Sequence, residues 1–148
     1  MKVLIFGKGV RKRVDKYRIN SQELISHLRA ERLLKERGFV VNEKNVNCLF
    51  PSNGKESMKH WLVKAMLFKL LRNLNRRVGT EIETRTGIVD VVDIDKLIAY
   101  EIESELRTEK IEERLRSLWF MRDIFFIDIR RVPNDFAEAE EYLKRKIV

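Results

Sequence analysis

The sequence predicts a single α/β domain in which a helix, a three-stranded meander, a second helix, a fourth strand and a closing helix follow one another. Residues 56–75 and 108–122 repeat apolar side chains at helical spacing, and an apolar run at 124–129 is stopped by a proline. Three short runs with strand-like patterns lie between the helices, at residues 78–84, 88–94 and 97–104. A strand, a helix and a strand are expected ahead of this core.

The chain divides most clearly at the Pro-Ser-Asn-Gly stretch of residues 51–54, whose turn-forming residues interrupt every periodic pattern. We therefore expect a basic N-terminal extension, residues 1–50, packed on a core of residues 51–148 within one compact domain. A chain of 148 residues with 44% hydrophobic content is long enough to bury a core.

Residues 1–6 have the pattern of a strand and end at a Gly-Lys-Gly tripeptide. The tripeptide lacks the remaining residues of a P-loop, which argues against a nucleotide site of that type. The basic run that follows forms either a solvated arm or a contact for a nucleic-acid backbone. Its centre contains Arg11, Lys12 and Arg13.

Residues 21–38 are predicted to form a helix, because a leucine stripe runs along them and a glycine follows basic residues at their end. Short extended segments are expected at 39–41 and 46–50. The extension would add a layer to the core's sheet or form a small winged-helix-like unit. Its helix is also an alternative first helix of the core, with Glu23 or Glu31 as the acidic residue.

The helix over residues 56–75 carries His60 and Lys64 four positions apart, so that both side chains share a face. Both are either exposed residues of an amphipathic helix or functional groups. In the functional interpretation, His60 contacts a phosphate or a metal-bound water and Lys64 contacts a phosphate.

The acidic residues of the meander give the strongest functional signal. A tight turn between its second and third strands places Asp90 opposite Glu101, about 5 Å apart at Cβ, with Glu103 on the same face. The other face is expected to carry Val89, Val91, Ile98, Tyr100 and Ile102.

Like charges placed opposite each other destabilise a sheet, and carboxylates that share a site must raise a pKa or share a cation. The three acids are therefore either a solvated face or a site for a hard divalent cation, which prefers oxygen ligands. Apolar neighbours on the same face, Val92 and Ala99, indicate partial burial and favour Mg²⁺ or Mn²⁺.

Asp90, ten intervening residues and then Glu101-Ile102-Glu103 resemble the active-site motif of the PD-(D/E)XK nucleases, the restriction-endonuclease-like superfamily. The order of elements from residue 56 onward is also similar to the core of that family. The resemblance implies a restriction-endonuclease-like fold over about the last two-thirds of the chain. A His-x-x-x-Lys helix ahead of the acidic hairpin is similar to that of some of these nucleases.

The resemblance implies that Asp90 and Glu101 bind the catalytic metal. Glu103 occupies the family's Lys position, as in E-x-E variants, and would complete the metal site or position the water. Lys110 or Arg107 is expected to supply the positive charge that the Lys would have brought.

Family members often carry a further acid on the first helix or the first strand. Glu81 and Glu83 are the candidates on the first strand, where they alternate with Ile82. We name Glu83 as the additional metal ligand, while at least one of the two is expected to be a surface acid.

A net charge of +8 and a pI of about 9.7 predict attraction to polyanions. Basic residues that flank the acidic hairpin are candidates for holding the phosphate backbone: Arg76, Arg77 and Arg85.

The apolar run at 124–129 is predicted to be a buried, central strand, and a last helix is expected after Pro133. Trp61 and Trp119 are expected in the core rather than on a base-stacking surface.

We expect a cytoplasmic protein, because Cys48 is the single cysteine and neither a membrane-spanning run nor a signal-peptide pattern is present. The abundance of Lys, Arg and Glu beside a single glutamine is typical of thermophile proteins.

These patterns predict a Mg²⁺- or Mn²⁺-dependent endonuclease acting on nucleic acid, DNA rather than RNA. The alternatives are a nuclease-fold protein that binds nucleic acid without cleaving it, and a junction-resolvase-like homodimer.

Overall fold

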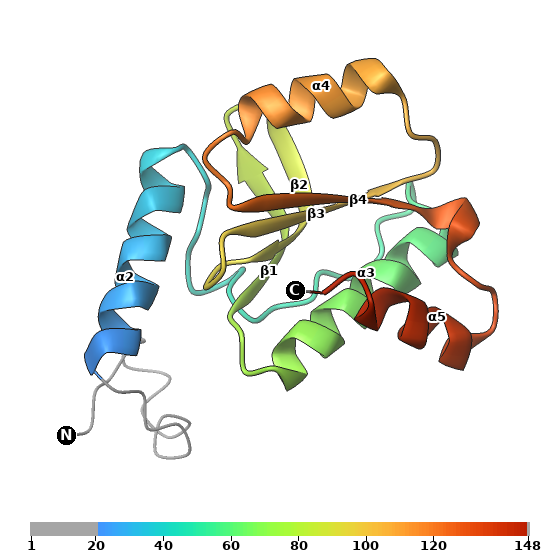
Figure 1. Cartoon of the computed structure of the whole chain (residues 1–148), viewed down its shortest axis with the longest axis horizontal. Helices are drawn as coiled ribbons and strands as arrows, with labels where there is room; N and C mark the ends of the chain where they lie inside the picture. Colours follow the sequence, from blue (N-terminus) through green and yellow to red (C-terminus); the bar gives the residue numbers. More distant parts are fainter. Residues whose placement is uncertain (1–20, 148) are drawn as a thin grey trace.

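The computed structural model describes residues 21–147 (Figure 1). The predicted strand at residues 1–6 and the basic residues Arg11, Lys12 and Arg13 lie outside this range. In chain order the elements are α2 (Ser21–Glu36), α3 (Met58–Asn73), β1 (Val78–Thr84), β2 (Gly87–Asp93), β3 (Ile98–Glu103), α4 (Thr108–Ser117), β4 (Asp123–Asp128), the 3₁₀ turn η2 (Ile129–Arg131) and α5 (Phe136–Lys144).

Across the described residues, four strands form one mixed sheet in the order β1-β2-β3-β4. The first three strands are antiparallel neighbours, and β4 runs parallel to β3. Because parallel strands need a crossover connection, α4 links β3 to β4. The prediction of an α/β domain with a three-stranded meander and a fourth strand is confirmed at this level.

Strand β4 lies at the edge of the sheet, so the prediction of a central, buried strand is wrong. The crossover returns the chain beside β3, which is the last strand of the meander and still has a free side. As a result, the first four residues of β4, Asp123–Phe126, are only partly buried. The apolar run at 124–129 therefore predicts the strand correctly but does not predict its position in the sheet.

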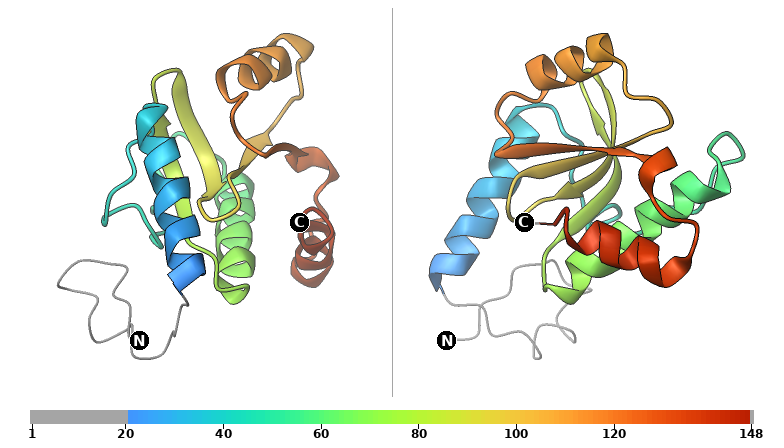
Figure 2. Two further views of the ribbon diagram at one scale, coloured as in Figure 1. Left: turned by 60° about the vertical axis from the view of Figure 1, so that its left-hand side comes forward. Right: turned by 45° about the vertical axis from the view of Figure 1, so that its right-hand side comes forward.

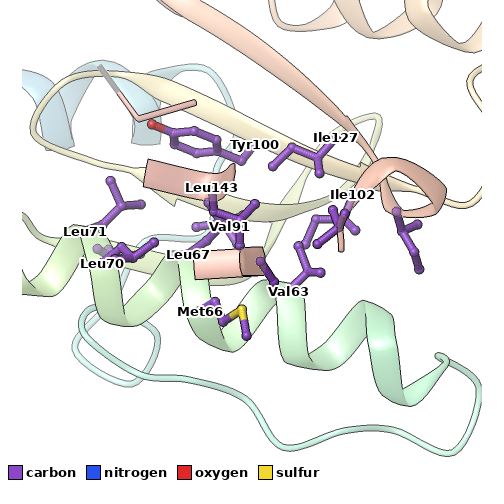
Figure 3. Packing of buried hydrophobic residues seen from close by; sticks show 14 of the residues in the cluster. Val63, Met66, Leu67, Leu70, Leu71, Val91, Tyr100, Ile102, Ile127 and Leu143 are labelled. Atoms are coloured by element: carbon purple, nitrogen blue, oxygen red, sulfur yellow. The ribbon is translucent and has the colours of Figure 1, made fainter. Parts of the chain in front are cut away.

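Helices α3 and α5 lie on one side of the sheet, and α4 lies on the other side (Figures 1 and 2). The core beneath α3 combines its inner face with the inner residues of β2 and β3 and with α5 (Figure 3). The second core joins the end of α2 to the opposite face of the sheet and to the turn after α4. Its residues include Leu34, Phe39, Val92, Leu118 and Met121.

Local signals explain both long helices. Ser57 caps α3, since its hydroxyl accepts a hydrogen bond from the backbone N–H of His60. Gly38 follows α2 with a φ of +86°, a left-handed conformation that suits glycine at a helix end. A β-carbon at Gly38 would also collide with the side chain of Arg85, so the two segments pack closely there.

The second strand expected in the N-terminal extension does not form. Residues 39–41 are irregular, although the backbone N–H of Val40 donates to the Glu83 carbonyl at 2.9 Å. Val46 and Cys48 make only isolated bridges to Gly79. The predicted strand-helix-strand extension is thus a helix followed by a loop along β1, within the described part of the chain.

The β1–β2 ladder is interrupted where Glu81 faces Asp90. Thr80 pairs with Val91 and Ile82 pairs with Val89, but the intervening pair is missing and Glu81 has a φ of +49°. Val89 consequently packs in the second core, whereas Val91 packs in the first. The prediction that both valines share a face is wrong, and the irregularity lies at the acidic residue that the sequence singled out.

Candidate functional site

A cleft of about 430 Å³ opens between the start of α3, the first half of β2, the end of β3, and α4. It brings together most of the residues named from the motif, including both ends of the Asp-x₁₀-Glu-x-Glu pattern. The charged and titratable lining residues are Lys55, Glu56, His60, Asp90, Glu101, Glu103, Lys110 and Arg114.

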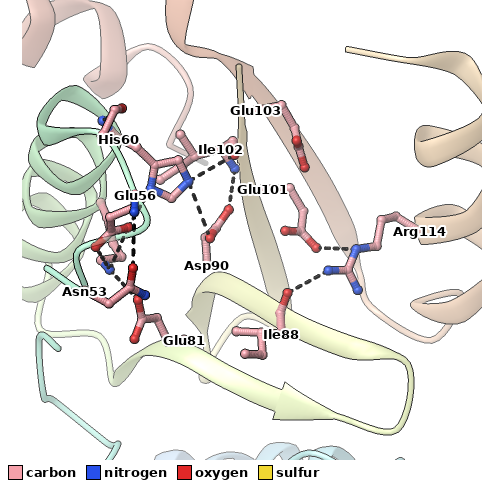
Figure 4. A network of polar contacts seen from close by, with 12 residues as sticks. Asn53, Glu56, His60, Glu81, Ile88, Asp90, Glu101, Ile102, Glu103 and Arg114 are labelled. Atoms are coloured by element: carbon pink, nitrogen blue, oxygen red, sulfur yellow. Dashed lines mark hydrogen bonds and ion pairs between the residues drawn. The ribbon is translucent and has the colours of Figure 1, made fainter. Parts of the chain in front are cut away.

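Strands β2 and β3 follow the predicted register, with Val91 opposite Tyr100 and Val92 opposite Ala99. One step further along this register, at Asp90 and Glu101, the backbone pairing stops. The Oδ2 atom of Asp90 instead accepts a hydrogen bond from the backbone N–H of Ile102 at 2.7 Å (Figure 4). The Asp90 side chain thus provides a hydrogen-bond acceptor for the backbone of β3 where the ladder ends. The second carboxylate oxygen of Asp90 faces His60.

Glu101 is the most buried acid of the cleft, with 2% of its surface exposed. The Nε atom of Arg114 lies 3.0 Å from Oε1 of Glu101, but that oxygen accepts no well-aligned hydrogen bond from any described residue. Burial raises the pKa of Glu101 to about 8, with Arg114 opposing the rise and the Asp90 charge adding to it. The site therefore holds a carboxyl group that is unusually costly to ionise without a further cation.

Helix α4 supplies two cations to the acids of β3. Lys110 donates to Glu103 at 2.7 Å, and Arg114 donates to the Ile88 carbonyl at 2.6 Å while it lies beside Glu101. The sequence singled out Lys110 but missed Arg114. The spacing of Lys110 and Arg114 could have identified Arg114, because residues four positions apart share one helix face.

His60 links α3 to the acidic strands (Figure 4). Its Nδ1 lies 2.8 Å from Glu56, and its Nε2 lies 3.2 Å from the Ile102 carbonyl and 3.7 Å from Asp90. Both ring nitrogens thus face acceptors, which favours the doubly protonated imidazolium. The contact with Asp90 is the largest cause that raises the pKa of His60 to about 8, despite partial burial.

Lys64 is fully buried, and its ammonium group lies between Glu56 and Glu81. The Nζ atom is 3.1 Å from Glu56 and 2.7 Å from Glu81. A direct phosphate contact would require Lys64 to leave both partners. Glu56, which sequence reasoning did not single out, therefore joins His60 and Lys64 in one network beside the cleft.

Glu83, named as an additional metal ligand, is exposed on β1 and does not line the cleft. Glu81 is nearer to the site, because it bonds to Lys64. The left-handed backbone at Glu81 breaks the simple alternation that led us to expect both acids on one face.

Two of the arginines expected to hold phosphate lie in ion pairs at the start of β1. Arg76 binds Asp93 at 2.8 Å, and the buried Arg77 binds Asp95 at 2.7 Å and Glu31 at 2.9 Å. They join the sheet to its β2–β3 turn and to α2. Arg85, in contrast, is exposed at the β1–β2 turn.

No set of three His, Cys, Asp or Glu side chains within residues 21–147 is arranged to hold a metal ion. The oxygen atoms of Asp90, Glu101 and Glu103 nevertheless have the chemistry that Mg²⁺ and Mn²⁺ require. The unsatisfied, buried oxygen of Glu101 fits such a ligand, provided that Arg114 and Lys110 yield space.

No family model, curated protein or solved structure matches the chain. Among the helices of the described residues, none has the length and apolar character needed to cross a membrane.

Proposed function

We propose that the chain is a metal-dependent endonuclease of the PD-(D/E)XK type that hydrolyses phosphodiester bonds in DNA. The observation that carries this proposal is the meeting of Asp90, Glu101 and Glu103 in one cleft, at the point where β2 and β3 stop pairing. The buried Oε1 atom of Glu101 lies beside Arg114 but accepts no hydrogen bond from the described residues, which leaves it available to a further cation.

The architecture supports the same proposal. A helix, an antiparallel meander, a crossover helix, a parallel strand and a closing helix follow one another in the described chain. This is the order that the resemblance to the PD-(D/E)XK superfamily implies.

In this proposal Asp90, Glu101 and Glu103 hold Mg²⁺ or Mn²⁺, which supplies a Lewis acid and an activated water for in-line attack on phosphorus. The chain's own residues prepare this site. His60 fixes the Asp90 side chain through charge, and Arg114 lowers the cost of ionising Glu101. Lys110 is half exposed at the mouth of the cleft, where it can pair with Glu103 or with a substrate phosphate.

The test is incubation of the purified chain with circular, linear, single-stranded and double-stranded DNA, in Mg²⁺, Mn²⁺ or EDTA. Asp90→Ala and Glu101→Gln should abolish a metal-dependent cleavage that the wild type shows. Glu112→Gln is the matched control, because Glu112 is an exposed acid of α4 outside the cleft. Cleavage that persists in EDTA or in both cleft variants would contradict the proposal.

A nuclease-fold protein that binds DNA without cleaving it is the second candidate. The observation that favours it is the occupation of the cleft acids by the chain's own cations, Arg114 on Glu101 and Lys110 on Glu103. The same experiment distinguishes the two, since this candidate predicts DNA binding with no cut under any metal.

A junction-resolvase-like dimer remains a proposal with one favourable observation. Helix α2 exposes Ile25 and Leu28, each by about half of its surface. Light scattering of the wild type and of an Ile25→Ser, Leu28→Ser double variant would test it, because a dimer through α2 should become a monomer.

A further inference from the structure

Trp119 lies on the surface just after α4, with 66% of its area exposed. The expectation that this residue belongs to the core is therefore wrong. A large aromatic side chain exposed to this extent forfeits much of the free energy that its burial would contribute. Its position calls for a physical explanation.

The indole ring is nevertheless held in a fixed place. Phe120 meets it edge to face, with ring centres 6.2 Å apart, and Phe120 in turn contacts the buried Phe39 at 5.6 Å. The guanidinium of Arg37 lies 4.6 Å from the centre of the indole ring. Arg37 thus lies over the indole ring, while 66% of the residue Trp119 stays exposed.

Three cations without acidic partners among the described residues belong to the segments next to this ring. Arg37, Arg85 and Arg116 are exposed, and none forms an ion pair with a carboxylate of the described chain. Arg85 packs its side chain against Gly38, directly after Arg37, and Arg116 precedes Trp119 by three residues. Arg76, Arg77 and Arg114, by contrast, are held in ion pairs, so these three arginines keep a positive charge that no carboxylate of the described chain neutralises: Arg37, Arg85 and Arg116.

The group is continuous with the acidic cleft. Arg114, which lines the cleft, donates to Ile88, and its guanidinium lies close to Gly87 at the β1–β2 turn. Arg85 belongs to the same turn. The end of α2, this turn and α4 lie at one end of the molecule (Figure 1).

We propose that Trp119, Arg37, Arg85 and Arg116 form a docking surface for single-stranded DNA, with Trp119 stacking on an unpaired base and the arginines contacting phosphates. Bases inside a duplex are already stacked on each other, so an exposed indole ring gains a stacking partner only from an unpaired base. Aromatic and arginine groups bind such strands with little sequence preference.

This inference rests on the proposed function in one respect, because it names the substrate class as DNA with a single-stranded segment leading into the cleft. Binding itself requires neither metal nor cleavage. The two proposals can therefore fail independently.

The test is titration of a fluorescently labelled oligothymidylate, and of a duplex of equal length, in EDTA. Trp119→Ala should weaken single-strand binding about five- to hundredfold, the range expected for loss of one stacked base. Trp119→Phe should retain most of the affinity, and duplex binding should change less than twofold. Phe136→Ala is the control, because Phe136 is an exposed aromatic residue on α5.

Arg37→Gln provides a second measurement that does not alter the aromatic ring. It should reduce the slope of log affinity against log salt by about 0.7 for a single strand. Circular dichroism of each variant checks that the fold is intact.

Three results would overturn the proposed docking surface. They are no binding of the single strand by the wild type, equal loss of single-strand and duplex binding in Trp119→Ala, or a wild-type dimer that Trp119→Ala converts to a monomer. If the wild type cleaves DNA but Trp119→Ala binds and cleaves normally, only this inference fails. If binding depends on Trp119 and no cleavage occurs, only the nuclease proposal fails.

Discussion

The Nε atom of Arg114 lies 3.0 Å from Oε1 of Glu101, and the two residues bring α4 to the acidic end of β3. The pair is not an ordinary buried salt bridge, because the pKa of Glu101 still rises to about 8. Desolvation of the carboxylate outweighs the attraction of Arg114, as is common when charges leave water. The free energy of unfolding should therefore depend on the protonation of Glu101.

Between pH 4.5 and about 8 the folded chain keeps a proton on Glu101 that the unfolded chain releases. The free energy of unfolding therefore falls as pH rises through this window. Glu101→Gln removes this decline. In EDTA at pH 8 the variant should be more stable than the wild type by about 4 kcal/mol, since the pKa rises from 4.5 to about 8 and each pKa unit corresponds to about 1.36 kcal/mol.

Urea unfolding at pH 5 and pH 8 measures the effect as a difference between variant and wild type, so that other titrating groups cancel. Glu112→Gln should follow the wild type at both pH values. An equal pH dependence in Glu101→Gln and wild type would show that Glu101 ionises normally.

Metal binding should act in the opposite sense on the same carboxyl group. If Mg²⁺ or Mn²⁺ binds at Asp90 and Glu101, it displaces the Glu101 proton and stabilises the folded chain, by about 2.7 kcal/mol at a hundredfold excess over Kd. The shift in Tm should grow from pH 6 to pH 8 and be absent in Asp90→Asn. Calorimetry in two buffers of different ionisation enthalpy would detect the released proton. A Tm that responds equally in Asp90→Asn places the metal elsewhere.

The register of β2 against β3, which aligns Asp90 with Glu101 just beyond the last paired residues, could be predicted because two constraints agree. The period of a strand is two residues, and a short turn leaves little freedom in how β2 and β3 align. The position of Val89 could not be predicted, since it depends on the left-handed backbone of Glu81. Nothing at a glutamate announces that conformation, which is usual for glycine or asparagine.

The basic residues show a second structural feature that the sequence does not predict. Lys64 and Arg77 are candidates for phosphate contacts in the sequence, yet both are buried. Their acidic partners Glu81, Asp95 and Glu31 lie 17, 18 and 46 positions away in the chain. Composition reports the charge of a side chain, but only the fold decides whether that charge is already neutralised.

Lys64→Met should therefore act on stability rather than on DNA contact. The substitution leaves Glu56 and Glu81 close together without the ammonium between them, a change that costs about 3–5 kcal/mol when a buried pair is broken. Lys69→Met on the same helix is the matched control, because Lys69 is exposed and should change the free energy of unfolding by less than about 0.5 kcal/mol. Urea unfolding of both variants decides the matter; equal stabilities would mean that Lys64 is dispensable to the fold.

Arg77 and Arg85 should separate in the same way, although both flank the acidic hairpin in sequence. Arg77→Ala removes the group that binds Asp95, Glu31 and the His27 carbonyl, and should lower the free energy of unfolding by about 3–5 kcal/mol.

Arg85→Ala should leave the free energy of unfolding within about 0.5 kcal/mol of the wild type, because Arg85 is exposed and forms no ion pair with a carboxylate of the described chain. Its effect should appear in DNA binding, where loss of one phosphate contact reduces the salt slope by about 0.7–0.9. Measuring urea unfolding and salt-dependent DNA binding on both variants gives each arginine its own control. A destabilised Arg85→Ala, or an Arg77→Ala that folds normally but loses a phosphate contact, would contradict this division of roles between the two arginines. We expect neither result, because a buried guanidinium shared by two carboxylates has little charge left for a third anion.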